Sequence, residues 1–348
     1  MFFLTAQQLV LRLVALVVPA MILGTACENA LMEEEPEATP QAVFEDFWKQ
    51  VDENYSFFAL KNVNWQTVRD TFAPKLRPGM SDPELLNLLG DMLGTLRDGH
   101  NYIQNGFNRR AYANWYVDYP YNFDEEILER NYWFQGDAEP NYTGPLVHFI
   151  IDSVGYIYYG SFSGNISESN LNYVLGRFNA FGVKGIVFDV RNNGGGNPEN
   201  GYKLVRRFID QERPLYRYQL KDGPAHDDFT PLEAARLSPE GGERFTGPIT
   251  VLTNRYCYSA ANIFVCMMSE LPNVTLLGDT TGGGGGVPAG KELPNGWVLS
   301  ISSSRIFRAS DDLNIELGIP PDTLVAQLPE DDLAGRDRLL EAAVLRMQ

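Results

Sequence analysis

Histidine and cysteine are scarce in this chain, with three of each in 348 residues. No Cys/His cluster has the spacing of metal ligands and no cofactor motif is present, so the sequence predicts neither a metal nor a cofactor. Basic residues are also few, since the chain has 28 Lys and Arg residues against 45 Asp and Glu residues, which gives a net charge of −17. Such a chain repels phosphate groups, which argues against a nucleic-acid partner.

The apolar run near the N-terminus is too short for a membrane-spanning helix. Residues 13–23 follow Arg12 and are interrupted by Pro19, which suits a signal peptide better than a transmembrane segment. The run leads to Gly24-Thr25-Ala26-Cys27, where small residues precede a cysteine as in bacterial lipoprotein signals. We expect residues 1–27 to be a signal peptide with Cys27 lipidated, and a plain cleaved signal peptide is the alternative. The protein would then be anchored in the bacterial cell envelope, facing the periplasm or the exterior.

Residues 28–40 are rich in Glu, Ala and Pro and lack apolar periodicity, so they read as an acidic disordered tether. Of the other cysteines, Cys257 precedes a predicted helix and Cys266 lies on it. The mostly helical span between them is about 13 Å, beyond the ~7 Å limit between the Cα atoms of a disulfide. We expect both to be free, buried thiols.

Ser259 stands between an apolar strand, predicted over 249–252, and a helix predicted over 260–270. At a helix N-terminus, free backbone N–H groups and the positive end of the helix dipole stabilise negative charge, which a nucleophile and its oxyanion require. Serine is also a favoured N-cap residue, so a purely structural cap is the alternative.

Two further segments point to the same chemistry. The buried strand predicted over 185–190 runs into Gly194-Gly195-Gly196, where the backbone can approach a ligand and offer N–H donors. His100 follows a helix-like stretch, residues 85–96. We interpret His148 as structural, within a strand, and His226 as solvated, in a polar loop. A histidine, a serine at a helix start and a glycine-rich donor loop together form a hydrolase constellation.

The order of these motifs resembles the tail-specific or C-terminal-processing serine peptidases, and more closely their tricorn-core-like branch. The blocks that carry the resemblance lie in the family's order and cover roughly residues 44 to 325. They are Phe57 to Trp65, Leu96 to Tyr102, Val154 to Phe162, Asp189 to Gly196, Arg255 to Phe264, Gly278 to Gly283 and Glu316 to Asp322.

The resemblance implies a serine endopeptidase that acts on polypeptides through an acyl-enzyme. It assigns Ser259 as the nucleophile, His100 as the general base and Glu316 as the residue that orients the imidazole. The N–H groups of Ala260 and of one glycine in 194–196, of which we favour Gly195, would hold the oxyanion. A surface carboxylate is the alternative for Glu316, and Cys257 is a rival nucleophile. Asp189 and Arg191 are expected to pair and shape the glycine loop.

Two positions depart from the family pattern. One branch uses a Ser–Lys dyad, but its lysine position falls on Gly284 here, and Lys291 does not align. The tricorn-like branch can place a serine before the histidine, where this chain has Gly99. A non-catalytic protein that binds polypeptides or hydrophobic ligands on the same fold is therefore the alternative function.

The expected architecture is an α/β catalytic core of the crotonase/ClpP type, preceded by a small helical domain. Apolar residues at helical spacing place that domain at 41–100. Residues 101–150 would connect it to a core over 151–348, and are too few for the PDZ domain that many family members carry. Within the core we expect a flap over 214–247 and a strand over 297–307.

Overall fold

The computed structural model describes residues 38–117, 119–133 and 140–348. The predicted signal peptide, its Cys27 and most of the acidic tether lie outside the described residues. None of the helices in the described part of the chain is long and apolar enough to cross a membrane. The α-helices are α2 (Pro40–Asn54), α3 (Trp65–Phe72), α4 (Asp82–Gly94), α5 (Glu125–Leu128), α6 (Glu168–Phe181), α7 (Pro198–Arg206), α8 (Ala260–Ser269), α9 (Pro329–Leu333) and α10 (Arg338–Leu345). The structure also has the 3-10 helices η1 (Ala73–Lys75) and η3 (Ile315–Leu317), and a π-helix, η2 (Glu129–Trp133).

The strands belong to three sheets. The largest has the order β14-β10-β9-β6-β5-β4-β3, a second has the order β11-β12-β1-β2, and the third has the order β13-β7-β8. Their bounds are β1 (Tyr102–Gln104), β2 (Arg109–Ala111), β3 (Asn141–Thr143), β4 (Leu146–Ile151), β5 (Val154–Tyr158), β6 (Gly185–Asp189), β7 (Arg213–Leu220), β8 (Glu233–Leu237), β9 (Ile249–Thr253), β10 (Val274–Gly278), β11 (Pro288–Glu292), β12 (Val298–Ser302), β13 (Ser304–Arg308) and β14 (Thr323–Leu324).

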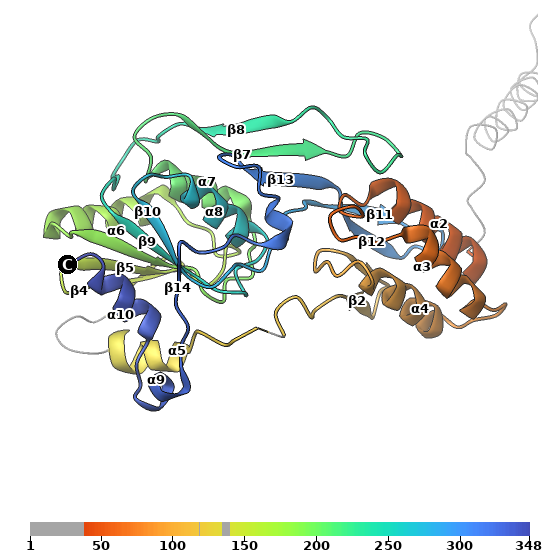
Figure 1. The fold of residues 1–348 in the computed structure, drawn as a ribbon, viewed down its shortest axis with the longest axis horizontal. Coiled ribbons are helices and arrows are strands. Elements are labelled where there is room, and N and C mark those ends of the chain that lie inside the picture. Colours follow the sequence, from red (N-terminus) through yellow and green to blue (C-terminus); the bar gives the residue numbers. More distant parts are fainter. Residues whose placement is uncertain (1–37, 118, 134–139) are drawn as a thin grey trace, which may run out of the picture.

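The largest sheet is parallel from β14 to β5, and β4 and β3 add antiparallel strands at one edge. Successive side chains of a strand point to opposite faces. In β6, Ile186 and Phe188 pack into the cluster formed with α6, α7 and α8, while Val187 packs into the cluster that contains α10. Figure 1 shows α6, α7 and α8 on one side of this sheet and α5 and α10 on the other. The α/β fold class is confirmed, and the strands predicted near 154–160, 185–190 and 249–253 are β5, β6 and β9.

The N-terminal helices do not form a core by themselves. Their buried faces pack on the sheet β11-β12-β1-β2, so that Phe47 and Leu89 share a cluster with Trp297 and Ile301. The predicted N-terminal helical region is present, but β11 and β12 come from the stretch that the sequence assigns to the catalytic core. The apolar periodicity of a helix indicates that one face is buried without indicating which segment covers it. The predicted connecting segment 101–150 likewise contributes β1 and β2 to this sheet, and β3 and β4 to the largest one.

The third sheet lies between these two parts (Figure 1). The strand predicted over 297–307 is interrupted at Ser303, and its halves, β12 and β13, belong to different sheets. The predicted flap is the β7–β8 hairpin, and its tip contacts α2. There His226 Nε2 lies 2.8 Å from Asp52 Oδ1, and the imidazole packs 4.5 Å from the ring of Phe58. His226 is thus a contact between two parts of the molecule and not simply a solvated side chain.

Candidate active site

Ser259 lies at the junction between β9 and α8, as the sequence predicts. Its φ is 55° and its ψ is −122°, a conformation that non-glycine residues rarely adopt. Backbone hydrogen bonds hold it there, because Ser259 N donates to Gly283 O at 3.0 Å and Tyr258 N donates to Asn193 O at 3.1 Å. The serine side chain makes no capping hydrogen bond to α8. This geometry supports the nucleophile interpretation over the structural N-cap.

The glycine loop lies directly against the serine. A Cβ atom on Gly195, whose φ is +97°, would come within 2.7 Å of Tyr258 O and 2.9 Å of Ala260 N. Only glycine fits here, so the backbone of the loop and the first amide of α8 face the same small space. In this conformation the Gly195 N–H donates to Asn193 Oδ1 at 2.9 Å. The donor that the sequence favours for the oxyanion therefore already has a partner.

His100 follows α4 and lies beside the residue that precedes the serine. Its ring centroid is 5.0 Å from that of Tyr258, and its backbone N–H donates to Asp98 Oδ1 at 2.9 Å. Burial lowers the pKa of His100, while Asp98 and a hydrogen bond to the Gly286 backbone oppose this effect. Within the described residues, His100 Nδ1 is buried without a hydrogen-bond partner. No hydrogen bond joins the ring to Ser259 in the part of the chain that the structure describes.

Glu316 is buried, so it is not the surface carboxylate of the alternative interpretation. Its Oε2 accepts from Gly285 N at 2.8 Å, and its Oε1 accepts from Lys61 Nζ at 2.6 Å. Burial first, and then the charge of Asp98, raise the pKa of Glu316 to about 7, although Lys61 acts in the opposite direction. No hydrogen bond to His100 is found among the described residues, so the carboxylate faces a lysine instead of the imidazole.

Sequence reasoning missed Lys61 and Asp98. The Lys61 ammonium is 3.8 Å from Asp98 Oδ2, and the side chains of both residues are almost fully buried. Lys61 lies inside the first block of the family resemblance, and Asp98 is two residues before His100. Their positions in these blocks were the available signals, but nothing in the sequence pairs them.

Comparison with known proteins places these features in one family. The model of peptidase family S41 matches residues 153–325, and that of the tricorn protease C1 domain matches residues 36–94. The crystal structure of a putative peptidase from Parabacteroides merdae is 40% identical, with a TM-score of 0.83, over 89% of this chain and 97% of that one. This chain belongs to peptidase family S41. The predicted resemblance is confirmed, and it places the chain among serine peptidases.

More distant relatives share parts of the chain. The carboxy-terminal processing protease CtpA of Bacillus subtilis (strain 168) is 28% identical over 179 residues, which are 51% of this chain and 36% of that protein. The tricorn protease of Thermoplasma acidophilum is 26% identical over 170 residues, 48% of this chain and 14% of that protein. The match therefore spans well under half of these curated relatives. Mature CPAF, with a TM-score of 0.64 and 12% identity, shares the fold.

The lysine of the S41 dyad has no room at its family position. Gly284 has a φ of +74°, and a Cβ atom there would lie 2.5 Å from the ring of Tyr258. The Tyr258 ring is itself stacked on Trp115, with 4.1 Å between the ring centroids. The same two rings exclude a side chain at Gly99, where the tricorn-like branch can place a serine. A Cβ atom there would lie 2.8 Å from Trp115 Nε1 and 2.9 Å from Tyr258 Oη. Two aromatic rings thus fill the space that these family side chains would occupy.

Cys257 is not a competing nucleophile in this S41 site. It is fully buried, and its Sγ donates to Val190 O at 2.9 Å. Burial raises its pKa to about 12, so the reactive thiolate is not available near neutral pH. Cys257 and Cys266 are both free and buried, as predicted.

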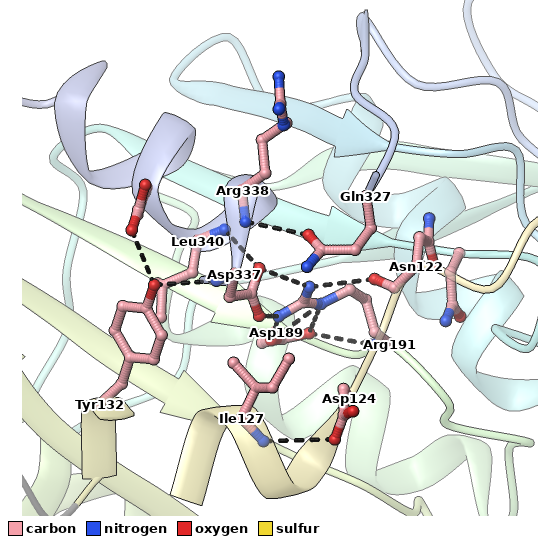
Figure 2. Close-up of polar contacts among 12 residues, drawn as sticks. Asn122, Asp124, Ile127, Tyr132, Asp189, Arg191, Gln327, Asp337, Arg338 and Leu340 are labelled. Atoms are coloured by element: carbon pink, nitrogen blue, oxygen red, sulfur yellow. Dashed lines mark hydrogen bonds and ion pairs between the residues drawn. The ribbon is translucent and has the colours of Figure 1, made fainter. Parts of the chain in front are cut away.

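The glycine loop is held from behind by a buried ion network (Figure 2). Arg191 Nη2 is 2.5 Å from Asp189 Oδ2 and 2.7 Å from Asp337 Oδ2, and Arg191 Nη1 donates to Asn122 O at 3.3 Å. Tyr156 Oη donates to Asp189 Oδ2 at 2.9 Å. Asp189 and Arg191 pair at the base of the loop, as the sequence predicts.

A cavity of about 390 Å³ opens beside the candidate site. A larger cavity of about 760 Å³, lined by Trp48, Asp52 and His226, lies between α2 and the hairpin tip, away from the serine. The smaller one is the closer to Ser259, because Tyr258, the preceding residue, lines it. Its lining includes Lys61, Gly99, Trp115, Tyr258, Gly282 and Glu316.

Proposed function

We propose that this protein is a serine endopeptidase that hydrolyses peptide bonds through an acyl-enzyme formed on Ser259. The observation that carries the proposal is the conformation of Ser259, held at a positive φ with its side chain free of a capping bond. Strain of this kind at a strand-to-helix turn is typical of an exposed nucleophile. The serine peptidases of family S41 supply the reaction class.

In the proposed first step, His100 takes the proton of Ser259 Oγ as that oxygen attacks the carbonyl carbon of a peptide. The carbon–nitrogen bond then breaks, and the imidazolium returns the proton to the leaving amine. In the second half of the cycle, water attacks the acyl carbon while His100 takes its proton. The ester bond to Ser259 Oγ then breaks, and His100 returns the proton to that oxygen, which releases the acid product and restores Ser259. A base with a pKa below the usual imidazole value, as burial gives His100, is neutral and ready at neutral pH.

The developing oxyanion would be held by the Ala260 N–H, at the start of α8, and by an amide of the glycine loop. Gly195 is the amide that lies against Ala260, and using it requires release of its bond to Asn193. Glu316 would stabilise the charged imidazole through its field, since its oxygens are engaged by Lys61 and Gly285. Removal of one oxyanion donor costs about 100- to 1000-fold in rate.

Covalent labelling tests the proposal. The purified protein would be treated with an alkyl fluorophosphonate, and the labelled residue mapped by mass spectrometry. We expect labelling at Ser259, none in Ser259→Ala, and labelling slowed by about 100-fold or more in His100→Ala. His226→Ala is the matched control, because its imidazole lies at the hairpin tip and should leave the rate unchanged.

The outcomes separate the two functions. Labelling that persists in His100→Ala would remove the histidine from its role and point to another base, of which Lys291 in β11 is the first to test. A folded protein whose Ser259 is not labelled would favour the alternative, a protein that binds polypeptides or hydrophobic ligands without cleaving them.

The envelope anchor is a separate proposal that rests on the sequence alone. We propose that Cys27 carries lipid and that residues 28–40 hold the enzyme away from the membrane. Mass spectrometry of the mature N-terminus checks this: a lipidated Cys27 supports the anchor, and an N-terminus elsewhere or an unmodified Cys27 excludes it.

A further inference from the structure

Lys61 reaches the candidate site from the N-terminal part of the chain. It lies in the turn between α2 and α3, which is closed by hydrogen bonds from Lys61 N to Phe57 O and from Val63 N to Phe58 O. Asn62 completes the turn with a φ of 53°. This local geometry directs the lysine side chain inward, where it is only 8% exposed.

Reciprocal bonds fasten this turn to the loop that carries His100. Lys61 Nζ donates to Arg97 O at 3.0 Å, and Arg97 Nη2 donates to Lys61 O at 2.6 Å. The same ammonium contacts Glu316 Oε1 at 2.6 Å and lies 3.8 Å from Asp98 Oδ2. One cation therefore joins three segments that are far apart in the sequence.

The charge balance around Glu316 depends on this cation. Two buried carboxylates that share a site do not both remain ionised without a counter-charge. Arg97 is exposed and directs its guanidinium to the backbone of Lys61, and Arg255, which lines the same cavity, donates to the backbone of Trp115 and Thr281. The titratable and charged groups that face Glu316 and its neighbour Asp98 are Lys61, Tyr55, Tyr258 and His100.

We propose that Lys61 is a positioning residue for the reaction: its ammonium, in contact with Glu316, favours the ionised form of that carboxylate, which in turn supports His100 as the base. The inference rests on the proposed function of Ser259 and His100. It assigns a chemical role to the N-terminal region, which supplies the ammonium from outside the core that carries the nucleophile. Docking of the 57–64 turn then determines whether the site is in its reactive charge state.

The pH dependence of Ser259 labelling tests this role. Lys61→Met removes the ammonium but keeps most of the side-chain stem. Loss of the cation raises the pKa of Glu316, and also that of His100, which Lys61 lowers. Both changes move the acid limb of the rate profile to higher pH, by about one unit. Lys61→Arg keeps the charge and should leave the limb within about 0.3 units, and Lys49→Met, which removes an exposed lysine of α2, should not move it.

Repeating the Lys61→Met substitution in a Glu316→Gln protein shows whether Lys61 acts through Glu316. In Glu316→Gln the carboxylate is absent, so adding Lys61→Met should produce less than half of the shift seen in the wild-type background. The inference would be overturned by any of three results for the acid limb of the labelling profile. These are a full shift when Lys61→Met is added to Glu316→Gln, no shift in a folded Lys61→Met protein, and a full shift in Lys61→Arg. Thermal unfolding confirms that each variant is folded, and if Lys61→Met does not fold, Lys61→Gln replaces it in both backgrounds with the same expected shifts. Wild-type protein without Ser259 labelling would instead overturn the proposed function.

Discussion

Two buried ion clusters in the described part of the chain each place one cation between two carboxylates, and they differ in how well their polar atoms are hydrogen-bonded. Behind the glycine loop, the planar Arg191 guanidinium donates to Asp189, Asp337 and the Asn122 backbone. Beside the candidate site, the Lys61 ammonium is close to Glu316 but 3.8 Å from Asp98. Within the described residues Asp98 Oδ2 has no hydrogen-bond partner.

The difference follows from the two cations. A guanidinium presents several donors in a fixed plane and can hold two carboxylates at once, whereas an ammonium is a point charge. The side chains of Arg191, Asp189 and Asp337 are almost fully buried at the base of the glycine loop. The Lys61 cluster lines a cavity and includes a carboxyl with a pKa of about 7, so it can change its charge near neutral pH. The first cluster is suited to structure and the second to chemistry.

The largest expected effect comes from removing the guanidinium. Arg191→Met leaves Asp189 and Asp337 buried without a counter-charge, and we expect it to lower the free energy of unfolding by about 3–5 kcal/mol. Urea titration followed by circular dichroism measures the change. Arg236→Met, at an exposed pair with Glu212, is the control and should cost less than about 1 kcal/mol. A loss below 1 kcal/mol for Arg191→Met would mean that the two clusters do not differ as described.

Glu316 should make stability depend on pH. Its pKa is about 7 in the folded protein against an ordinary value of 4.5, so the folded state holds its proton more tightly. The stabilisation from that proton is complete below about pH 4.5 and is lost as pH rises through 7, a change of about 3 kcal/mol. Glu316→Gln stays neutral, and its free energy of unfolding relative to wild type should rise by this amount between pH 4.5 and 8.

Urea titrations at several pH values measure this difference, and Glu53→Gln, at a partly exposed carboxylate of α2, serves as the control. A difference between Glu316→Gln and wild type that stays constant with pH would show that the carboxyl does not titrate in this range.

The smallest expected effects are the losses of stability when one tyrosine beside each cluster is changed to phenylalanine. Tyr156 Oη donates to Asp189, whereas Tyr258 Oη is buried without a hydrogen-bond partner among the described residues. Tyr156→Phe removes a bond to a charged group and should cost about 1–3 kcal/mol, while Tyr258→Phe should change stability by no more than about 0.5 kcal/mol. Chemical denaturation of both variants under one condition provides the comparison, and equal losses would contradict it.

The sequence predicts the parts of the site that depend on local structure. Ser259, the glycine loop and the start of α8 follow from an apolar strand, a glycine run and a helix in direct succession, and these are periodicities that a single segment carries. The pairing of Asp189 with Arg191 was also accessible, because the two residues are two positions apart.

The partner of Glu316 could not be found in this way. Lys61 is 255 positions away along the chain, and no periodicity relates two segments at that distance. For the same reason the sequence predicts a small helical domain over 41–100 but does not show that β12 covers its helices. The interruption at Ser303 escapes prediction too, because both halves have the composition of a single strand.

The packing of β12 against the N-terminal helices has a consequence for biosynthesis. A ribosome makes these helices early, but their apolar faces stay uncovered until the chain has been extended through Ile301. Glu316 emerges later still, so Lys61 meets its carboxylate only after the chain has been extended through residue 316. A nascent polypeptide that ends before Glu316 lacks this charge pair, so the candidate site cannot be assembled until that residue has been made.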